Sequence, residues 1–191
     1  MSDTPAAKEL RRTPALATTP WLQPLPPVSR CILQADPAAL ELAARALGLG
    51  ADVGAGGGVA HATGALLWLG PDERLLLGNT DEPSSSTLAP ALAATLAPAL
   101  DGLTYSLIDV SHRQIGLRLR APFAAALLNC ACPQDLDAEA FPPGLCSRTL
   151  YGKAEIVLWR LEVEEFRIEV WRSYADYLTE SLVEAAKDLE R

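Results

Sequence analysis

Three of the four cysteines in this 191-residue chain lie between positions 130 and 146, where they could bind a metal or carry out redox chemistry. A structural zinc site usually needs two close cysteine pairs, or two cysteines with two neighbouring histidines. Here Cys130 and Cys132 form one C-x-C pair, Cys146 is distant, and no histidine lies nearby. The spacing also differs from the C-x-x-C of thioredoxin-type dithiols. We therefore predict that these thiols bind no zinc and that Cys130 packs as a small apolar side chain on a helix.

The segment Asp109-Val-Ser111-His112 contains the three residue types of a hydrolase triad. Along a strand, residues 109 and 111 point to one side and residue 112 to the other. Neighbours in sequence cannot form the relay of a triad, so we interpret this segment as a polar strand end. The glycines from Gly54 to Gly58 follow a predicted helix, whereas a nucleotide-binding loop precedes one. They predict a flexible loop.

Basic side chains are concentrated near the second half of the chain, at Arg148, Lys153 and Arg160, with Tyr151 among them. Such a stretch could face an anionic ligand or an acidic partner. Ordinary surface charge explains it equally well. Arg148 and Tyr151 are therefore kept as candidate interface residues.

Composition limits the class of protein. The formal net charge is -8 and 49% of residues are hydrophobic, so the chain can bury a sizeable core and is repelled by nucleic acid and by anionic lipid. No apolar run approaches the ~18 residues of a transmembrane helix. The N-terminus has no apolar stretch after its charges and therefore does not resemble a secretory signal. We expect a cytoplasmic protein with reduced thiols.

The N-terminal residues 1–28 are rich in proline, threonine and alanine. Four prolines between residues 20 and 27 argue against a helix and against a central strand there. One interpretation is a flexible tail. The alternative is a segment that docks on a partner, because Trp21, Leu22 and Leu25 offer apolar area that a tail does not need.

The remaining sequence alternates between strand and helix patterns. The order is β-α-β-β-α-β followed by β-α-β-β-β-α, which predicts an α+β fold of two tandem ferredoxin-like lobes, residues 29–110 and 111–191. Asp36 and Pro37 predict the start of the first helix, and Ser173 is predicted to cap the last one. The predicted strands cover residues 30–33, 66–69, 75–77, 105–110, 114–120, 148–151, 154–160 and 166–172.

Trp159 is predicted to lie in a central strand. Ile156 and Leu158 point to one face of that strand, Val157 and Trp159 to the other, and both pairs are apolar. A strand that is apolar on both sides is covered on both sides, here by the other lobe or by a partner.

Four blocks carry a family resemblance: LLWLGPDERLLLG (66–78), IDVSHRQIGLRLRAP (108–122), CPQDLDAEAFPPGLCSRTLYGKAEIVLWR (132–160) and FRIEVWRSYADYL (166–178). With them the chain resembles the gamma subunit of heterotetrameric sarcosine oxidase through nearly all of residues 29–180. The most specific block runs from Cys132 to Arg160. The resemblance implies a fold related to the folate-binding region of the glycine-cleavage aminomethyltransferase.

The resemblance also implies an assembly of alpha, beta, gamma and delta chains that demethylates sarcosine to glycine. Oxygen and tetrahydrofolate are consumed, and 5,10-methylenetetrahydrofolate and hydrogen peroxide are formed. The family places the flavins FAD and FMN and the folate site on alpha and beta, NAD on alpha and zinc on delta. No cofactor or catalytic residue is then expected in this chain, and the alpha subunit is its expected partner.

A self-sufficient folate-binding or aminomethyl-transferring protein of related fold is the alternative function. The aminomethyltransferases carry an acidic pair after a glycine-rich stretch, whereas here Gly56-Gly57-Gly58 is followed by Val59-Ala60-His61. Folate binding is therefore not carried over to this chain.

Overall fold

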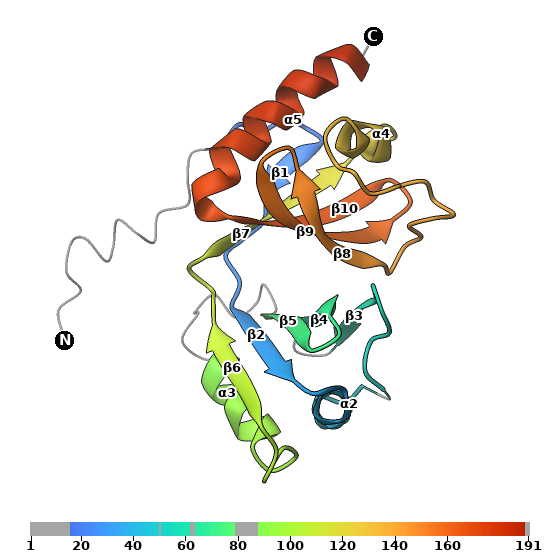
Figure 1. Cartoon of the computed structure of the whole chain (residues 1–191). Helices are drawn as coiled ribbons and strands as arrows, with labels where there is room; N and C mark the ends of the chain where they lie inside the picture. Colours follow the sequence, from blue (N-terminus) through green and yellow to red (C-terminus); the bar gives the residue numbers. More distant parts are fainter. Residues whose placement is uncertain (1–15, 50, 62–63, 79–87, 190–191) are drawn as a thin grey trace, which may run out of the picture.

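The chain forms two lobes, each a five-stranded antiparallel sheet with helices on its outer face (Figure 1). The computed structural model describes residues 16–49, 51–61, 64–78 and 88–189. The two sheets face each other across the middle of the molecule, so the order of layers is helices, sheet, sheet, helices. Within the described residues, no helix is long and apolar enough to cross a membrane.

The first lobe has the strand order β3-β4-β5-β2-β6. Without the edge strand β3, this is the ferredoxin-like order that the sequence predicts. Asp36 caps the first helix by accepting a hydrogen bond from Ala39 N at 2.8 Å. The elements are β2 (Arg30–Ala35), α2 (Pro37–Ala46), β3 (Gly58–His61), β4 (Gly64–Gly70), β5 (Glu73–Gly78), α3 (Leu88–Leu96) and β6 (Tyr105–Asp109).

The second lobe has the strand order β1-β7-β10-β9-β8. The strand β7 covers the residues predicted for it, because its apolar and polar residues alternate without interruption. Ser173 does not cap the last helix as predicted. It lies instead within a 3-10 turn that precedes the helix, and the N-cap residue of this turn, Trp171, makes no side-chain capping hydrogen bond. The elements are β1 (Leu22–Pro24), β7 (Gln114–Arg120), α4 (Ala124–Asn129), β8 (Cys146–Tyr151), β9 (Ala154–Glu162), β10 (Glu165–Trp171), η1 (Arg172–Tyr174) and α5 (Ala175–Leu189).

Strand β1 corrects the interpretation of residues 1–28 as a flexible tail. Leu22, Gln23 and Pro24 pair antiparallel with Leu119, Arg118 and Leu117 of β7. Leu22 is fully buried in the core of the second lobe. The end of this segment therefore belongs to the second lobe, and the boundary at residue 28 does not separate tail from domain. Residues 1–15 lie outside the described part of the chain.

Three apolar clusters hold the layers together. One lies between the second sheet and helices α4 and α5, and another lies between the first sheet and helices α2 and α3. The third lies between the two sheets and joins residues of β2, β4 and β5 to Cys146, Val157 and Trp159 of the second lobe.

The prediction for Trp159 is confirmed. Its strand, β9, lies between β10 and β8. Ile156 and Leu158 face the helices of their own lobe, while Val157 and Trp159 face the other lobe. Both apolar faces of the strand are thus covered within the chain.

Candidate interaction surface

The four cysteines do not converge on one site. Cys31, Cys132 and Cys146 are buried, and Cys130 is exposed, which corrects its predicted place in the core. Helix α4 ends at Asn129, so Cys130 lies in the turn beyond the helical apolar stripe. Among the described residues, no group of three or more His, Cys, Asp or Glu side chains could hold a metal ion.

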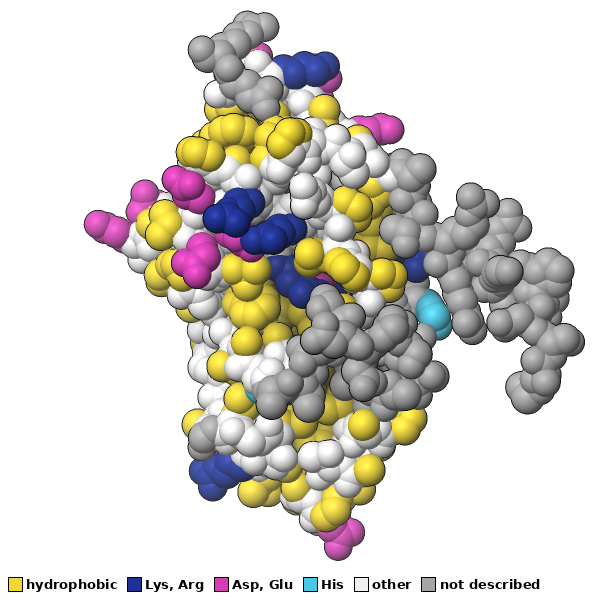
Figure 2. Space-filling model, turned by 180° about the vertical axis from the view of Figure 1, so that it is seen from behind, with side chains coloured by type: hydrophobic (Ala, Val, Ile, Leu, Met, Phe, Trp, Pro, Cys, Tyr) yellow, Lys and Arg dark blue, Asp and Glu magenta, His cyan; other side chains and the backbone are white. Residues whose placement is uncertain are grey.

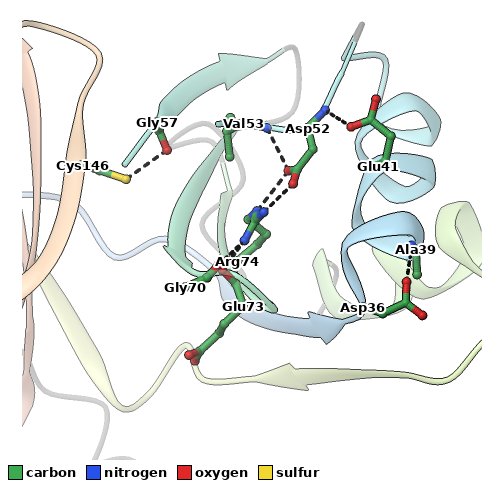
Figure 3. A network of polar contacts seen from close by, with 10 residues as sticks. All are labelled: Asp36, Ala39, Glu41, Asp52, Val53, Gly57, Gly70, Glu73, Arg74 and Cys146. Carbon is green, nitrogen blue, oxygen red and sulfur yellow. Dashed lines mark hydrogen bonds and ion pairs between the residues drawn. The ribbon is translucent and has the colours of Figure 1, made fainter. Parts of the chain in front are cut away.

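Cys146 has a structural role at the junction of the lobes. Its thiol donates to the carbonyl oxygens of Gly57 at 3.0 Å and Trp68 at 3.2 Å. The contact with Gly57 is drawn in Figure 3. Burial raises the pKa of the Cys146 thiol to about 11, so the reactive thiolate is disfavoured at neutral pH.

The glycine-rich segment forms part of the same junction. Gly58 N donates to Gly144 O and Cys146 N donates to Gly56 O, so the backbones of the two lobes are hydrogen-bonded directly. A Cβ atom on Gly58 would lie 2.6 Å from Nε1 of Trp159. The glycine is therefore required for close packing of one lobe on the other.

A polar network holds the segment before these glycines (Figure 3). Arg74, buried in the hairpin of β4 and β5, forms an ion pair with Asp52 and donates to Gly70 O. Asp52 N in turn donates to Glu41 of α2 at 2.8 Å. The charged groups of Arg74, Asp52 and Glu41 therefore stabilise the fold of the first lobe.

The polar segment at residues 109–112 also has a structural role. Ser111 Oγ accepts a hydrogen bond from Arg30 N at 2.9 Å, and Asp109 accepts one from Ser111 N at 2.8 Å. His112 is exposed. Ser111 and Asp109 are thus bound to backbone groups in a turn, as a polar strand end requires.

The basic residues singled out from the sequence do not form one surface. Arg160 is buried, and its Nη1 donates to the carbonyl oxygens of Leu136 at 3.0 Å and Phe141 at 2.7 Å. Tyr151 is also buried, and burial raises its pKa to about 12. Arg148 is exposed and forms an ion pair with Glu73 of the first lobe at 2.8 Å.

The five predicted interface residues therefore divide into two groups. Leu22 and Tyr151 are buried in the chain's own core and cannot contact a partner, which corrects the prediction for them. Arg148 is exposed, and Trp21 and Leu25 are half-buried. The indole of Trp21 packs edge-on against Phe123, with ring centroids 5.8 Å apart.

A different set of charged side chains does form one surface. On the inner side of the second sheet, β7 and β10 carry Arg118, Arg120, Glu165, Arg167 and Glu169, which we call the arginine face. The residues between them, Leu117, Leu119, Phe166 and Ile168, point the other way into the core. Figure 2 shows Lys or Arg and Asp or Glu side chains side by side in the upper half of the molecule.

The register of the arginine face places like charges together. Arg118 and Arg167 are direct cross-strand partners, an arrangement that destabilises a sheet unless it is compensated. Arg118 donates to Glu165 at 2.9 Å, and this hydrogen bond raises the pKa of Arg118. Arg167 donates to Glu169 at 2.7 Å. Each arginine of the pair therefore uses a different glutamate.

Glu169 also connects the arginine face to the first lobe. Its carboxylate forms an ion pair with Arg30 Nε at 2.6 Å, and both side chains are at least 98% buried. Burial alone would raise the pKa of Glu169, but the charges and hydrogen bonds of Arg30 and Arg167 lower it. With Arg30 included, four arginines share two glutamates, which leaves an excess of two positive charges.

The excess charge is most accessible at the edge of the sheet. Trp21, Gln23, Arg118 and Arg120 line a pocket of about 150 Å³, which we call the arginine pocket. The Arg120 side chain is 69% exposed, and it reaches the shared carboxylate of Glu165 only at 3.7 Å. Sequence reasoning missed this pocket because Arg118 and Arg120 match the pattern of an ordinary solvent-exposed strand face.

Comparisons with known proteins assign the family. Residues 33–188 match the model of the sarcosine oxidase, gamma subunit family. The chain is 33% identical to the sarcosine oxidase subunit gamma of Corynebacterium sp. (strain U-96) over 146 residues, which are 76% of this chain and 67% of that protein. It is 31% identical to the subunit gamma of Corynebacterium sp. (strain P-1) over 74% of this chain and 65% of that protein. These alignments therefore span about two thirds of the relatives.

Among solved structures, the chain resembles a chain of the heterotetrameric sarcosine oxidase from Corynebacterium sp. U-96 in complex with pyrrole 2-carboxylate. The TM-score is 0.75 and the sequence identity 28%, and the match covers 100% of this chain and 97% of that one. The family model covers most of the chain, and the similarity of fold extends over all of it. The chain belongs to the sarcosine oxidase gamma subunit family.

Proposed function

We propose that this chain is an accessory subunit of a heterotetrameric sarcosine oxidase and that it contributes binding surface rather than catalytic groups. The observation that carries the proposal is the similarity of fold over the entire chain to a chain of such an enzyme. The polar clusters inside the chain support it, because Cys146, Arg74, Ser111 and Arg160 are all bound to the chain's own backbone or side chains. Within the part of the chain that the structure describes, these four groups are therefore used to build the fold.

The reaction of the assembly would be the oxidative demethylation of sarcosine, with tetrahydrofolate and oxygen as co-substrates. We infer that the flavins FAD and FMN, the NAD and the zinc of the complex are held by the alpha, beta and delta subunits, and that the alpha subunit contacts this chain. The arginine pocket itself, with a volume of about 150 Å³, is smaller than the roughly 300–1,000 Å³ of sites for larger ligands. The free thiols suit a reducing compartment such as the cytoplasm.

Co-expression with the other three subunits tests the proposal. The chain should co-purify with a tag placed on another subunit, in a complex that forms hydrogen peroxide from sarcosine. Omission of the chain should lower the yield of assembled complex. If the chain purifies alone from that co-expression and binds tetrahydrofolate by itself in calorimetry, it is the self-sufficient folate protein instead, and the subunit role is wrong.

A further inference from the structure

We propose that the arginine pocket receives the carboxylate of an Asp or Glu side chain from another subunit, an inference that rests on the proposed subunit role. The pocket is formed at the outer edge of the second sheet, where β1 is the last strand. Its lining combines two guanidinium groups, from Arg118 and Arg120, with the amide of Gln23 and the indole of Trp21.

Charge favours an anionic occupant. The chain as a whole carries a formal charge of -8, so a local excess of positive charge on its surface is an exception to its composition. Glu165 supplies one carboxylate to two arginines, bound closely to Arg118 at 2.8 Å and only loosely to Arg120 at 3.7 Å. A second carboxylate beside Arg120 would complete the pairing, because guanidinium groups bind carboxylates with two parallel hydrogen bonds.

Size favours a single side chain over a free ligand. A volume of about 150 Å³ accommodates a carboxylate with its short stem, whereas sites for larger ligands start at roughly 300 Å³. Tryptophan and arginine are also the residue types that contribute most to the free energy of protein–protein binding. The half-buried Trp21 would then form an apolar wall against the stem of the incoming side chain.

The register of the sheet gives a further reason. The chain places Arg118 directly opposite Arg167, and like charges in such a pair lower stability. Glu165 and Glu169 compensate this pair within the chain, which leaves Arg120 without a close carboxylate of its own. A carboxylate from a partner would therefore bind at Arg120, the arginine with the longest contact to Glu165.

Charge reversal at Arg120 tests the inference in the co-expressed complex. Arg120→Glu should weaken the binding of this chain to the other subunits about tenfold or more, because a carboxylate of the partner would meet a like charge. Arg120→Gln should weaken it less and should reduce the dependence of binding on NaCl concentration. Arg45→Glu is the matched control, since Arg45 is 61% exposed on α2 of the other lobe; it should leave binding unchanged.

A crosslinking experiment identifies the bound group. Arg120→Lys keeps the charge and introduces an amine, which a carbodiimide joins directly to a neighbouring carboxylate. Mass spectrometry of the complex should find this amine linked to an Asp or Glu of another subunit. Crosslinks confined to Glu165 of the same chain would overturn the inference.

The outcomes separate this inference from the proposed function. If the unaltered chain fails to co-purify, the subunit role is wrong and the inference fails with it. If the unaltered chain assembles and Arg120→Glu assembles equally well, only the inference is wrong. Circular dichroism and thermal melting of the free Arg120→Glu chain should match those of the unaltered chain, because Arg120 is largely exposed.

Discussion

The two lobes repeat one arrangement but complete it from different parts of the sequence. In each sheet one strand, β2 or β7, pairs with a short edge strand on one side and with a hairpin on the other. In the first lobe this edge strand is β6, which follows the hairpin in sequence, and in the second it is β1 from the N-terminal segment. The first lobe is therefore inserted between β1 and the rest of the second lobe.

The inner faces of the two sheets differ in chemistry. The first sheet presents mainly apolar side chains to the junction, among them Ile32, Leu67 and Leu75, and one buried charge, Arg30. The second sheet presents an apolar half, with Val157 and Trp159, and a charged half, the arginine face. The first lobe covers the apolar half and leaves Arg118 and Arg120 accessible. The two lobes thus share an order of strands and differ in the chemistry of their inner faces.

The largest effect on stability is expected when the ion pair between Arg30 and Glu169, which links the two lobes, is broken. Glu169→Gln removes the carboxylate that Arg30 and Arg167 share, and it should lower the free energy of unfolding by about 3–5 kcal/mol, because two cations are left uncompensated. Urea denaturation measures the change. Glu155→Gln, at an exposed position near the start of β9, is the matched control; an equal loss there would contradict a special role for Glu169.

Comparison of the unaltered chain with Glu169→Gln also gives a prediction for the pH dependence of stability. Because the pKa of Glu169 in the folded chain lies below its usual 4.5, its stabilising contribution is present above that value and is lost as pH falls through the folded pKa. The difference in unfolding free energy between the unaltered chain and Glu169→Gln should therefore stay constant between about pH 6 and pH 8. It should shrink as pH falls below 4.5. A difference that grows on acidification would show the opposite sign of linkage.

The apolar half of the junction is tested at Trp159. Its side chain is 9% exposed and packs on Gly58 of the first lobe, so Trp159→Ala should lower the free energy of unfolding by about 3 kcal/mol. Trp171→Ala is the matched control. Trp171 is 38% exposed and stacks with Arg113, so its truncation should cost about 1 kcal/mol. Equal losses for the two variants would mean that the junction adds little to stability.

The smallest of these effects tests the edge strand taken from the N-terminal segment. Leu22→Ala should lower the free energy of unfolding by about 2 kcal/mol, the low end for a buried leucine because β1 is short and at an edge. The amide of Arg120, which donates to Trp21 O at 2.8 Å, should also exchange hydrogen faster. Leu42→Ala, at a position 40% exposed on α2, should cost less than about 0.5 kcal/mol. Unchanged exchange at Arg120 would contradict the pairing of β1 with β7.

Local signals were enough for most of the elements. The alternation of Gln114 to Arg120 predicted β7 because a half-buried strand has a period of two residues. The pair Asp36-Pro37 predicted the start of α2 because capping is a contact between near neighbours in sequence. The sequence pattern did not predict the two short strands β3 and β1. Strand β3 begins at a glycine, Gly58, and β1 has only three residues, in a proline-rich segment. Such strands are stabilised by their partners rather than by their own residues.

The sequence by itself determined which residues alternate, where the first helix begins and that both faces of β9 are apolar. The tertiary structure alone decided which side of each strand is covered and which charges become neighbours. Arg30 and Glu169 are 139 residues apart in sequence and 2.6 Å apart in space, and Arg118 faces Arg167 only through the register of β7 and β10. A shift of one residue in register would send every side chain of a strand to the opposite face. The arginine pocket therefore depends on strand pairing across the whole chain, which no local pattern encodes.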